Sequence, residues 1–187
     1  ERDGILEPTA IGPGDVLLGL ASNGMHANGF SLVRRLIEDQ GQDYAAAAPF
    51  APDVTLAEAL LRPTKIYVPS CLAAIRAGLI KGLSHITGGG LIENPPRIMP
   101  EGTVARINGA SWPMPPLFKW LAQLGQIEPL EMARTFNCGI GMIAIVAADD
   151  VAAATALFQE AGETVWPIGV IAAADGPARV EIGGLEF

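Results

Sequence analysis

The segment over residues 17–32 constrains the fold of this chain more than any other stretch. It reads LLGLASNGMHANGFSL, in which an apolar run gives way to a turn of small and polar residues and then to apolar side chains at helical spacing. A buried strand that leads through such a turn into an amphipathic helix is typical of α/β folds. The start of a helix also presents free N–H groups, which favour an anion such as phosphate. The segment therefore predicts an α/β protein with a ligand-binding turn.

The polar side chains of this turn suit an anionic ligand. Ser22, Asn23 and Asn28 add hydrogen-bonding groups beside the helix start. His26 is the candidate catalytic residue, because imidazole has an unperturbed pKa near neutrality and can exchange protons or contact phosphate. The alternative interpretation is that His26 only hydrogen-bonds its own turn.

Glycine-rich turns recur twice more along the chain. Residues 87–90 follow a predicted strand and residues 137–141 precede one, so three such turns lie at strand ends. Glycine lets the backbone adopt positive φ and approach a ligand closely, so that N–H groups converge on phosphate oxygens. Each turn alone is an ordinary connection, but three with polar neighbours predict one shared ligand-binding edge. The candidate binding residues in the first two turns are Ser22, Asn23, Gly24, Asn28, Gly29, Thr87, Gly88, Gly89 and Gly90.

Arg134 and Asn137 are the candidates beside the third turn. A guanidinium at this predicted helix-to-strand junction could bind a phosphate or a carboxylate, and a surface ion pair explains Arg134 equally well. His85 lies in a predicted apolar strand, so we expect a core histidine that positions its neighbours rather than a proton-transfer group. None of the turns carries the pattern of a Walker loop or of a dinucleotide-binding fold.

Composition argues against several classes of function. The chain has 187 residues, half of them hydrophobic, and a net charge of −8. This length suits one globular domain, and the acidic balance without a basic cluster argues against nucleic acid as a partner. No apolar run reaches the roughly 20 residues that cross a membrane. Cys71 and Cys138 lack metal-ligand spacing, so we expect reduced core cysteines, no metal site and a cytoplasmic protein.

Periodicity predicts alternating strands and helices. Strands are predicted over residues 16–20, 83–86, 103–107, 140–147, 165–171 and 179–182, with 140–147 the longest. Helices are predicted over residues 29–39, 56–61, 69–77, 117–124, 130–133 and 151–161, the last capped by Asp149 or Asp150. We expect residues 45–53 to form a surface loop and Asn94-Pro95-Pro96 to exclude regular structure. The pattern predicts a single α/β domain over residues 1–187 with mixed strand connections.

Several blocks of the sequence resemble AIR synthetase (phosphoribosylformylglycinamidine cyclo-ligase). They read GLASNGMHANGFSLVR over residues 19–34 and HITGGGLIENPPR over residues 85–97, with similar stretches at 112–121 and 132–142. The resemblance covers most of the chain in the family's order. It implies the family's C-terminal domain, a three-layer α/β (α+β) unit with a mixed sheet that is partly ferredoxin-like. It also implies that the N-terminal half, which carries most of the Mg²⁺–ATP site and the dimerising β-barrel in the family, is absent from this chain.

The resemblance also implies a reaction. In the family, formylglycinamidine ribonucleotide and ATP give aminoimidazole ribonucleotide, ADP and phosphate in purine biosynthesis. The formyl oxygen is phosphorylated, the amidine nitrogen attacks the same carbon, and phosphate leaves as the ring closes, so that catalysis depends mainly on positioning and charge stabilisation. By this resemblance the glycine turns, with Arg134 and Asn137 at their rim, hold substrate or nucleotide phosphate. We expect a homodimer for the full-length enzyme, and an isolated fragment that folds but does not turn over.

The chain departs from the family pattern at a few positions. Asn23 and Ala27 stand where the family often has serine, and Cys138 stands where methionine is common. Any ligand contact at Ala27 must therefore use the backbone. Formylglycinamidine ribonucleotide synthetase, selenophosphate synthetase, thiamine-monophosphate kinase and a hydrogenase-maturation protein share the architecture and stay open as alternatives. A non-catalytic ligand-binding module on the same fold is the alternative from a different class.

Overall fold

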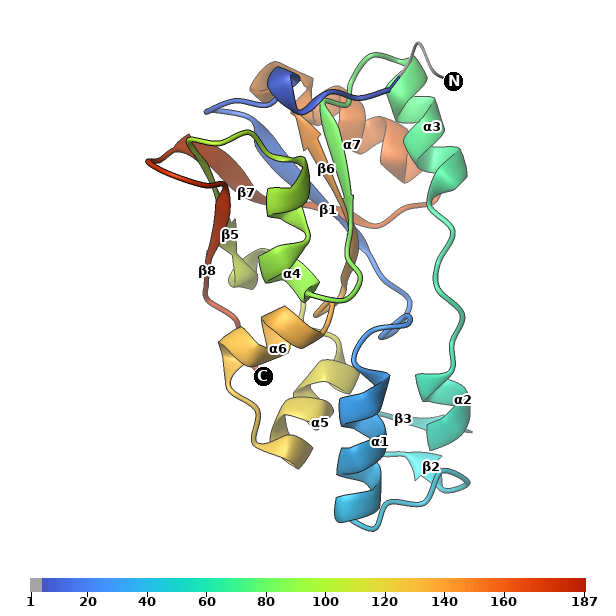
Figure 1. Ribbon diagram of the computed structural model, residues 1–187. Coiled ribbons are helices and arrows are strands. Elements are labelled where there is room, and N and C mark those ends of the chain that lie inside the picture. The colour runs from blue at the N-terminus through green and yellow to red at the C-terminus, as the bar shows by residue number, and fades with distance from the viewer. Residues whose placement is uncertain (1–4) are drawn as a thin grey trace.

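A six-stranded sheet lies at the centre of the computed structural model, which describes residues 5–187 (Figure 1). Its strands are β1 (Val16–Ala21), β4 (Gly82–His85), β5 (Thr103–Asn108), β6 (Ile140–Val146), β7 (Val165–Ala173) and β8 (Arg179–Gly183). They lie in the order β4-β6-β1-β7-β5-β8. Neighbouring strands are antiparallel except β5 and β8, which are parallel.

Four of the strands and two helices form a ferredoxin-like unit. The chain passes from β1 through α3 (Val68–Arg76) to β4, and from β6 through α7 (Val151–Glu160) to β7. The resulting order β4-β6-β1-β7, with antiparallel pairing throughout, is that of a split βαββαβ unit. β5 and β8 then extend the sheet beyond β7. The expected mixed sheet with partial ferredoxin likeness is confirmed.

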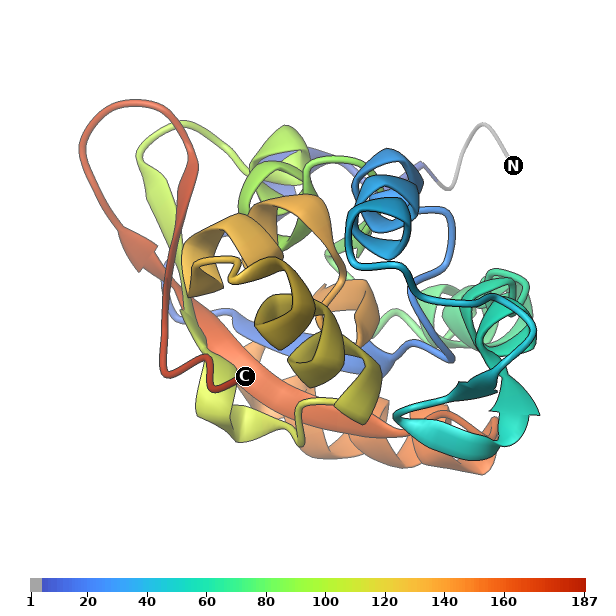
Figure 2. The ribbon, with the colours of Figure 1, turned by 90° about the horizontal axis from the view of Figure 1, so that it is seen from below.

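Helices cover both faces of the sheet, which confirms the expected three layers (Figures 1 and 2). Successive side chains of a strand point to opposite faces. Leu18 and Val146 accordingly pack with α3 and α7, whereas Leu17 and Ile145 belong to the core on the other face. That second core is covered by α4 (Gly90–Glu93), α5 (Pro116–Gly125) and α6 (Pro129–Thr135), and α1 (Phe30–Asp39) packs against α5.

The surface loop expected over residues 45–53 is wrong, because this segment forms a β-hairpin. Its strands are β2 (Ala47–Ala48) and β3 (Ala51–Thr55), and α2 (Leu56–Leu60) follows directly. Alanine has little intrinsic preference for strands. The hairpin is held from outside, because Ala48 is fully buried and the Phe50 ring lies 5.2 Å from the ring of Trp120 on α5.

Three smaller expectations also need correction. The prolines after Asn94 start a 3₁₀ helix, Pro95–Ile98, since proline suits the first helical positions. The longest strand is β7, with nine residues against seven in β6. Asp150 occupies the N-cap position of α7 as expected, but its side chain makes no capping hydrogen bond, because a 3₁₀ turn, Ala148–Asp150, leads directly into the helix. Further 3₁₀ turns are Pro8–Ala10 and Gly109–Ser111.

None of the helices within residues 5–187 has both the length and the apolar character to span a bilayer.

Candidate functional site

The three glycine-rich turns meet at one end of the sheet. β1 and β4 end there, and β6, which lies between them and runs the opposite way, begins there. The backbone N–H of Ser22 donates to the carbonyl of Gly139 at 2.8 Å, and that of Ile86 donates to Gly141 at 3.0 Å. We call this region the turn edge; it consists of residues 22–29, 87–90 and 137–141.

Two buried asparagines tie the turn edge together. Asn28 Nδ2 donates to the carbonyl of Ile86 at 3.1 Å and so links the first turn to the second. Asn137 is fully buried; its Oδ1 accepts from Ser22 Oγ at 3.0 Å, and its Nδ2 donates to the Gly24 carbonyl at 2.9 Å. Both side-chain amides point into the protein, so these residues fix the shape of the edge. Asn137, expected at the rim, lies beneath it.

His26 lies inside its own turn. The side chain is buried, at 4% exposure, and the backbone has a φ of 57°, which is in the left-handed region. Nε2 lies 2.9 Å from Asn23 Oδ1 and 3.4 Å from the backbone nitrogen of Lys65, while Nδ1 has no hydrogen-bond partner among the described residues. Burial, with smaller contributions from the charges of His85 and Lys65, lowers the pKa of His26 to about 4. The imidazole is therefore neutral at pH 7, which favours a positioning role, and its catalytic role stays a prediction.

The linker between α2 and α3 covers His26. Asn23 Nδ2 donates to the carbonyl of Pro63 at 3.0 Å, and the hydroxyl of Tyr67 donates to the carbonyl of Ala21 at 2.8 Å. The Tyr67 ring also lies 6.2 Å from the imidazole of His26. These contacts connect the linker to the first turn and to the end of β1, which leads into that turn.

A buried carboxylate anchors the same linker to the start of β7. Lys65 Nζ lies 2.6 Å from Glu163 Oε2, and Ser70 Oγ donates to Glu163 Oε1 at 2.8 Å. Glu163 is buried, and an ion pair shielded from water is screened less than one on the surface. The linker is thus held from both sides.

The second turn is shaped by close packing and by Asn94. Thr87 Oγ1 donates to Asn94 Oδ1 at 3.1 Å, and Asn94 Nδ2 donates to the Gly90 carbonyl at 2.8 Å. Gly90 has a φ of 56°, and a Cβ there would lie 2.1 Å from the carbonyl oxygen of Ala133. Only glycine fits this position. Gly88 is the exposed residue of the turn and leaves its backbone accessible.

Arg134 forms ion pairs at the protein surface. Its Nη1 lies 3.0 Å from Glu131 Oε2, and its Nε lies 3.6 Å from Glu93 Oε1. The side chain is about half exposed. This is the ion-pair arrangement that the sequence offered as the alternative to a ligand contact, and the ligand role of Arg134 stays a prediction.

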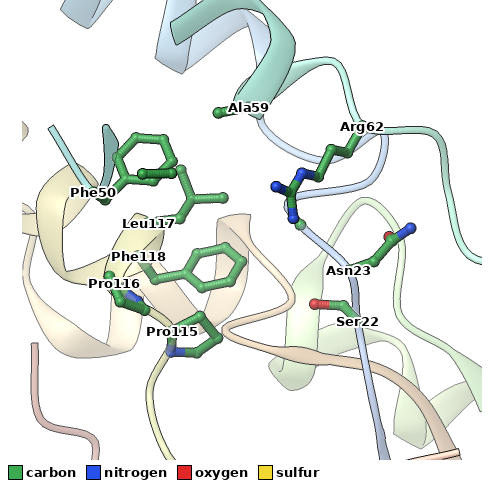
Figure 3. A pocket seen from close by; sticks show the side chains of 11 residues that line it. Ser22, Asn23, Phe50, Ala59, Arg62, Pro115, Pro116, Leu117 and Phe118 are labelled. Carbon is green, nitrogen blue, oxygen red and sulfur yellow. The ribbon is translucent and has the colours of Figure 1, made fainter. Parts of the chain in front are cut away.

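A cleft of about 260 Å³ opens beside the first turn (Figure 3). One wall is polar and consists of Ser22, Asn23, Gly24 and Arg62. The other wall is apolar and consists of Phe50, Ala51, Ala59, Pro115, Pro116, Leu117 and Phe118. The apolar wall includes the start of α5, whose first backbone N–H belongs to Leu117, because proline has none. The cleft therefore combines a cationic side chain and a helix N-terminus, which together suit an anion.

Arg62 is the residue of the cleft that sequence reasoning missed. Its guanidinium points toward the space in front of Ser22 (Figure 3), and no carboxylate of the described residues forms an ion pair with it. Glu58, four residues earlier, would be the usual helical partner. It is already engaged in a capping box, in which Glu58 N donates to Thr55 Oγ1 at 3.2 Å and Thr55 N donates to Glu58 Oε2 at 2.8 Å. The Thr-x-x-Glu pattern was therefore the sequence signal that Glu58 caps its own helix and does not pair with Arg62.

The expectation of a core histidine at position 85 is wrong. His85 is the exposed last residue of β4, which is the outermost strand of the sheet. The ring of Tyr67 lies 6.3 Å away and shields one side of the imidazole. An apolar sequence context therefore did not imply burial at this sheet edge.

Metal-binding groups do not gather in the part of the chain that the structure describes. Residues 5–187 contain no cluster of three or more His, Cys, Asp or Glu side chains that could hold a metal ion. Cys71 and Cys138 are free and buried. Burial raises the pKa of the Cys71 thiol to about 11 and that of Cys138 further, so both are protonated at neutral pH.

Comparison with known proteins identifies the family. The family model for the AIR synthase related protein, C-terminal domain, matches residues 12–181. A phosphoribosylformylglycinamidine cyclo-ligase from Neisseria meningitidis serogroup C (strain 053442) is 52% identical over 171 residues, which is 91% of this chain and 49% of the relative. The chain thus spans about half the length of the curated relatives it matches.

Solved structures show the same fold at low sequence identity. Thiamine-monophosphate kinase from Stenotrophomonas maltophilia K279a has a TM-score of 0.63 and 21% identity, covering 98% of this chain and 54% of that one. The hydrogenase maturation protein HypE from E. coli has a TM-score of 0.61 and 17% identity, covering 97% and 50%. The family model and the cyclo-ligase relatives thus show that the chain belongs to the family of AIR synthase related proteins and corresponds to the C-terminal domain of that family.

Proposed function

We propose that this chain is the C-terminal half of an ATP-dependent cyclo-ligase that converts formylglycinamidine ribonucleotide to aminoimidazole ribonucleotide, and that its cleft holds a phosphate group of substrate or nucleotide. Support for the reaction comes from the 52% identity to cyclo-ligases, against 21% to the thiamine-monophosphate kinase. The observation that carries the cleft assignment is Arg62, a guanidinium without a carboxylate partner among the described residues, opposite the start of α5.

The chain's own residues would bind and orient rather than perform chemistry. Arg62 would neutralise phosphate charge, and the backbone N–H of Leu117 would donate a hydrogen bond to a phosphate oxygen. The apolar wall would exclude water from the bound ligand, which strengthens each charged contact. His26 and Asn137 would hold the first turn in shape from beneath.

ATP would serve as the phosphoryl donor in this reaction. Transfer of its γ-phosphoryl group to the formyl oxygen breaks the bond to ADP and creates a phosphate leaving group; the amidine nitrogen then attacks that carbon, and phosphate departs as the ring closes. Mg²⁺ would neutralise nucleotide charge, but residues 5–187 supply no acidic cluster to hold it. We place the metal site in the rest of the full-length protein, as the family resemblance implies. We also place the protein in the cytoplasm, a reducing compartment in which buried free cysteines such as Cys71 and Cys138 persist.

Ribose 5-phosphate tests the cleft in the 187-residue chain. Titration followed by NMR should shift the amide signals of residues 22–24 and 117, and Arg62→Met should weaken binding about 10-fold or more, as expected for loss of a charge-assisted contact. Arg76→Met removes an exposed arginine from α3 and should leave binding unchanged. Equal affinity in the Arg62→Met variant and the unsubstituted chain would refute the assignment.

A further inference from the structure

An apolar groove lies beside the linker that covers His26. It has a volume of about 470 Å³ and is formed by the linker, one side of α3 and the end of β4. Ile66, Val68 and Leu72 border it with exposed side chains, and Ile66 is 77% exposed. Leu61 is exposed at the beginning of the same linker. Large exposed apolar patches of this kind mark surfaces that contact another protein part, a membrane or a ligand.

The groove is bounded by an unpaired sheet edge. β4 pairs with β6 on one side only, so the other side of its backbone has no strand partner among the described residues. Open edges in native proteins are generally shortened, charged or covered. Strand β4 is short, with four residues, but it contains no Lys, Arg, Asp or Glu side chain. Its protection is therefore incomplete.

Charge at the groove favours an apolar occupant. Lys65 is the one side chain with a permanent charge among the described residues that line it. That charge is neutralised by Glu163, 2.6 Å away. An acidic or basic partner would find no free opposite charge in the groove, whereas an apolar protein surface would find apolar side chains to pack against.

The course of the chain indicates which partner this is. Leu6 packs with the core beneath α3 and lines a hollow with Leu83, and Leu83 also borders the groove. The first described residues lie near α3 (Figure 1), and Leu83 borders both the hollow at Leu6 and the groove. In the curated relatives the matched region is about half of the chain, and the family model describes a C-terminal domain, so the unmatched half precedes it.

We propose that this groove is the surface on which the preceding half of the full-length cyclo-ligase chain packs. The inference rests on the proposed cyclo-ligase chain but not on its activity, because it concerns burial of Ile66, Val68 and Leu72. Ribose 5-phosphate binding at Arg62 is a separate measurement, so the two proposals can fail independently.

Cysteine accessibility tests the proposal. Val68→Cys is placed in the 187-residue chain and in a chimera, in which this chain replaces the matched 171 residues of the N. meningitidis serogroup C enzyme. We expect a water-soluble maleimide to label position 68 at least 10-fold more slowly in the chimera. Leu130→Cys is the matched control, because Leu130 on α6 is 58% exposed against 61% for Val68, and its rate should be equal in both proteins.

The separate N-terminal part of the Neisseria enzyme provides a second measurement if the chimera does not fold. Added to the Val68→Cys chain, it should slow labelling at position 68 and not at position 130. Equal labelling of position 68 with and without the N-terminal part overturns the proposal. Protection that instead increases with the concentration of the 187-residue chain alone assigns the groove to a second copy and also overturns it.

Discussion

Replacing His26 with asparagine is expected to flatten the dependence of stability on pH below neutrality. The histidine has a pKa of about 4 in the folded protein, because burial disfavours its charged form and the charges of His85 and Lys65 add to this. The ordinary value in an unfolded chain is about 6.5. Between these two values the unfolded state binds a proton that the folded state does not bind, so the free energy of unfolding falls as the pH falls.

The size of the effect follows from the two pKa values. One pKa unit corresponds to about 1.36 kcal/mol, so His26 should lower the free energy of unfolding by about 2 kcal/mol between pH 7.5 and pH 5. Asparagine cannot titrate and tolerates the φ of 57° at this position. The variant should therefore lose this part of the pH dependence, whatever its stability at pH 7.5.

Urea unfolding of the 187-residue chain, followed by tryptophan fluorescence, measures the effect at the two pH values. Carboxylates contribute to the slope in every variant, so the informative quantity is the difference from the unsubstituted chain. Gln40→Asn is the control; it changes an exposed side chain that does not titrate and should leave the slope unchanged. If His26→Asn keeps the full pH dependence, His26 titrates near its ordinary pKa, and the inference that it is a neutral positioning residue is wrong.

Two further stability predictions have matched controls. Gly29→Ala should lower the free energy of unfolding by about 2–4 kcal/mol, because φ is 71° and a Cβ would lie 2.3 Å from the ring of Phe136. The control is Gly41→Ala, at φ 60° in open space, which should lower it by only about 1 kcal/mol. Equal losses in thermal denaturation would argue against a contribution from the clash with Phe136. Glu163→Gln should lower the free energy of unfolding by about 1–3 kcal/mol, because it leaves a partly buried lysine without its partner. Glu181→Gln, in an exposed ion pair, should cost under about 1 kcal/mol, and urea midpoints that do not separate these two variants would contradict the role of the buried pair.

The meeting of the three turns was predictable because it depends on where strands end. A turn that follows one strand and a turn that precedes its antiparallel neighbour must lie at the same end of the sheet. Residues 22–29 and 137–141 satisfy this relation through β1 and β6, and residues 87–90 satisfy it through β4. Apolar periodicity placed these strands correctly, and the shared edge followed.

The direction of the polar side chains was not predictable in the same way. Asn28, Asn137 and His26 read as ligand-facing because they are polar residues in a glycine-rich turn. Their burial depends on segments distant in the sequence, such as the linker whose Lys65 backbone lies over His26. Single-sequence patterns contain no information on such coverage, because each pattern is local.

The hairpin that forms one wall of the cleft was missed for a related reason. Alanine and proline give residues 47–55 little strand preference, and the hairpin is stabilised by the contact of Phe50 with Trp120. Without this wall the cleft is not recognisable from the sequence. Arg62 is then an arginine before a proline and has no evident role.

The inward direction of these side chains changes what the turn edge can offer a ligand. Because Asn28 and Asn137 use their amides to hold the backbone, and the Ser22 hydroxyl donates its proton to Asn137, ligand contacts beside the first turn fall to backbone groups and to Arg62. A backbone fixed in this way loses little conformational freedom on binding, which favours affinity. Substitution of the buried asparagines should therefore weaken ribose 5-phosphate binding by disordering residues 22–24, with loss of folding stability, whereas Arg62→Met should weaken binding at unchanged stability. Measuring urea midpoints beside the titrations separates these two causes, and a stable Asn137→Ala variant with normal affinity would show that the edge does not need its amide tie.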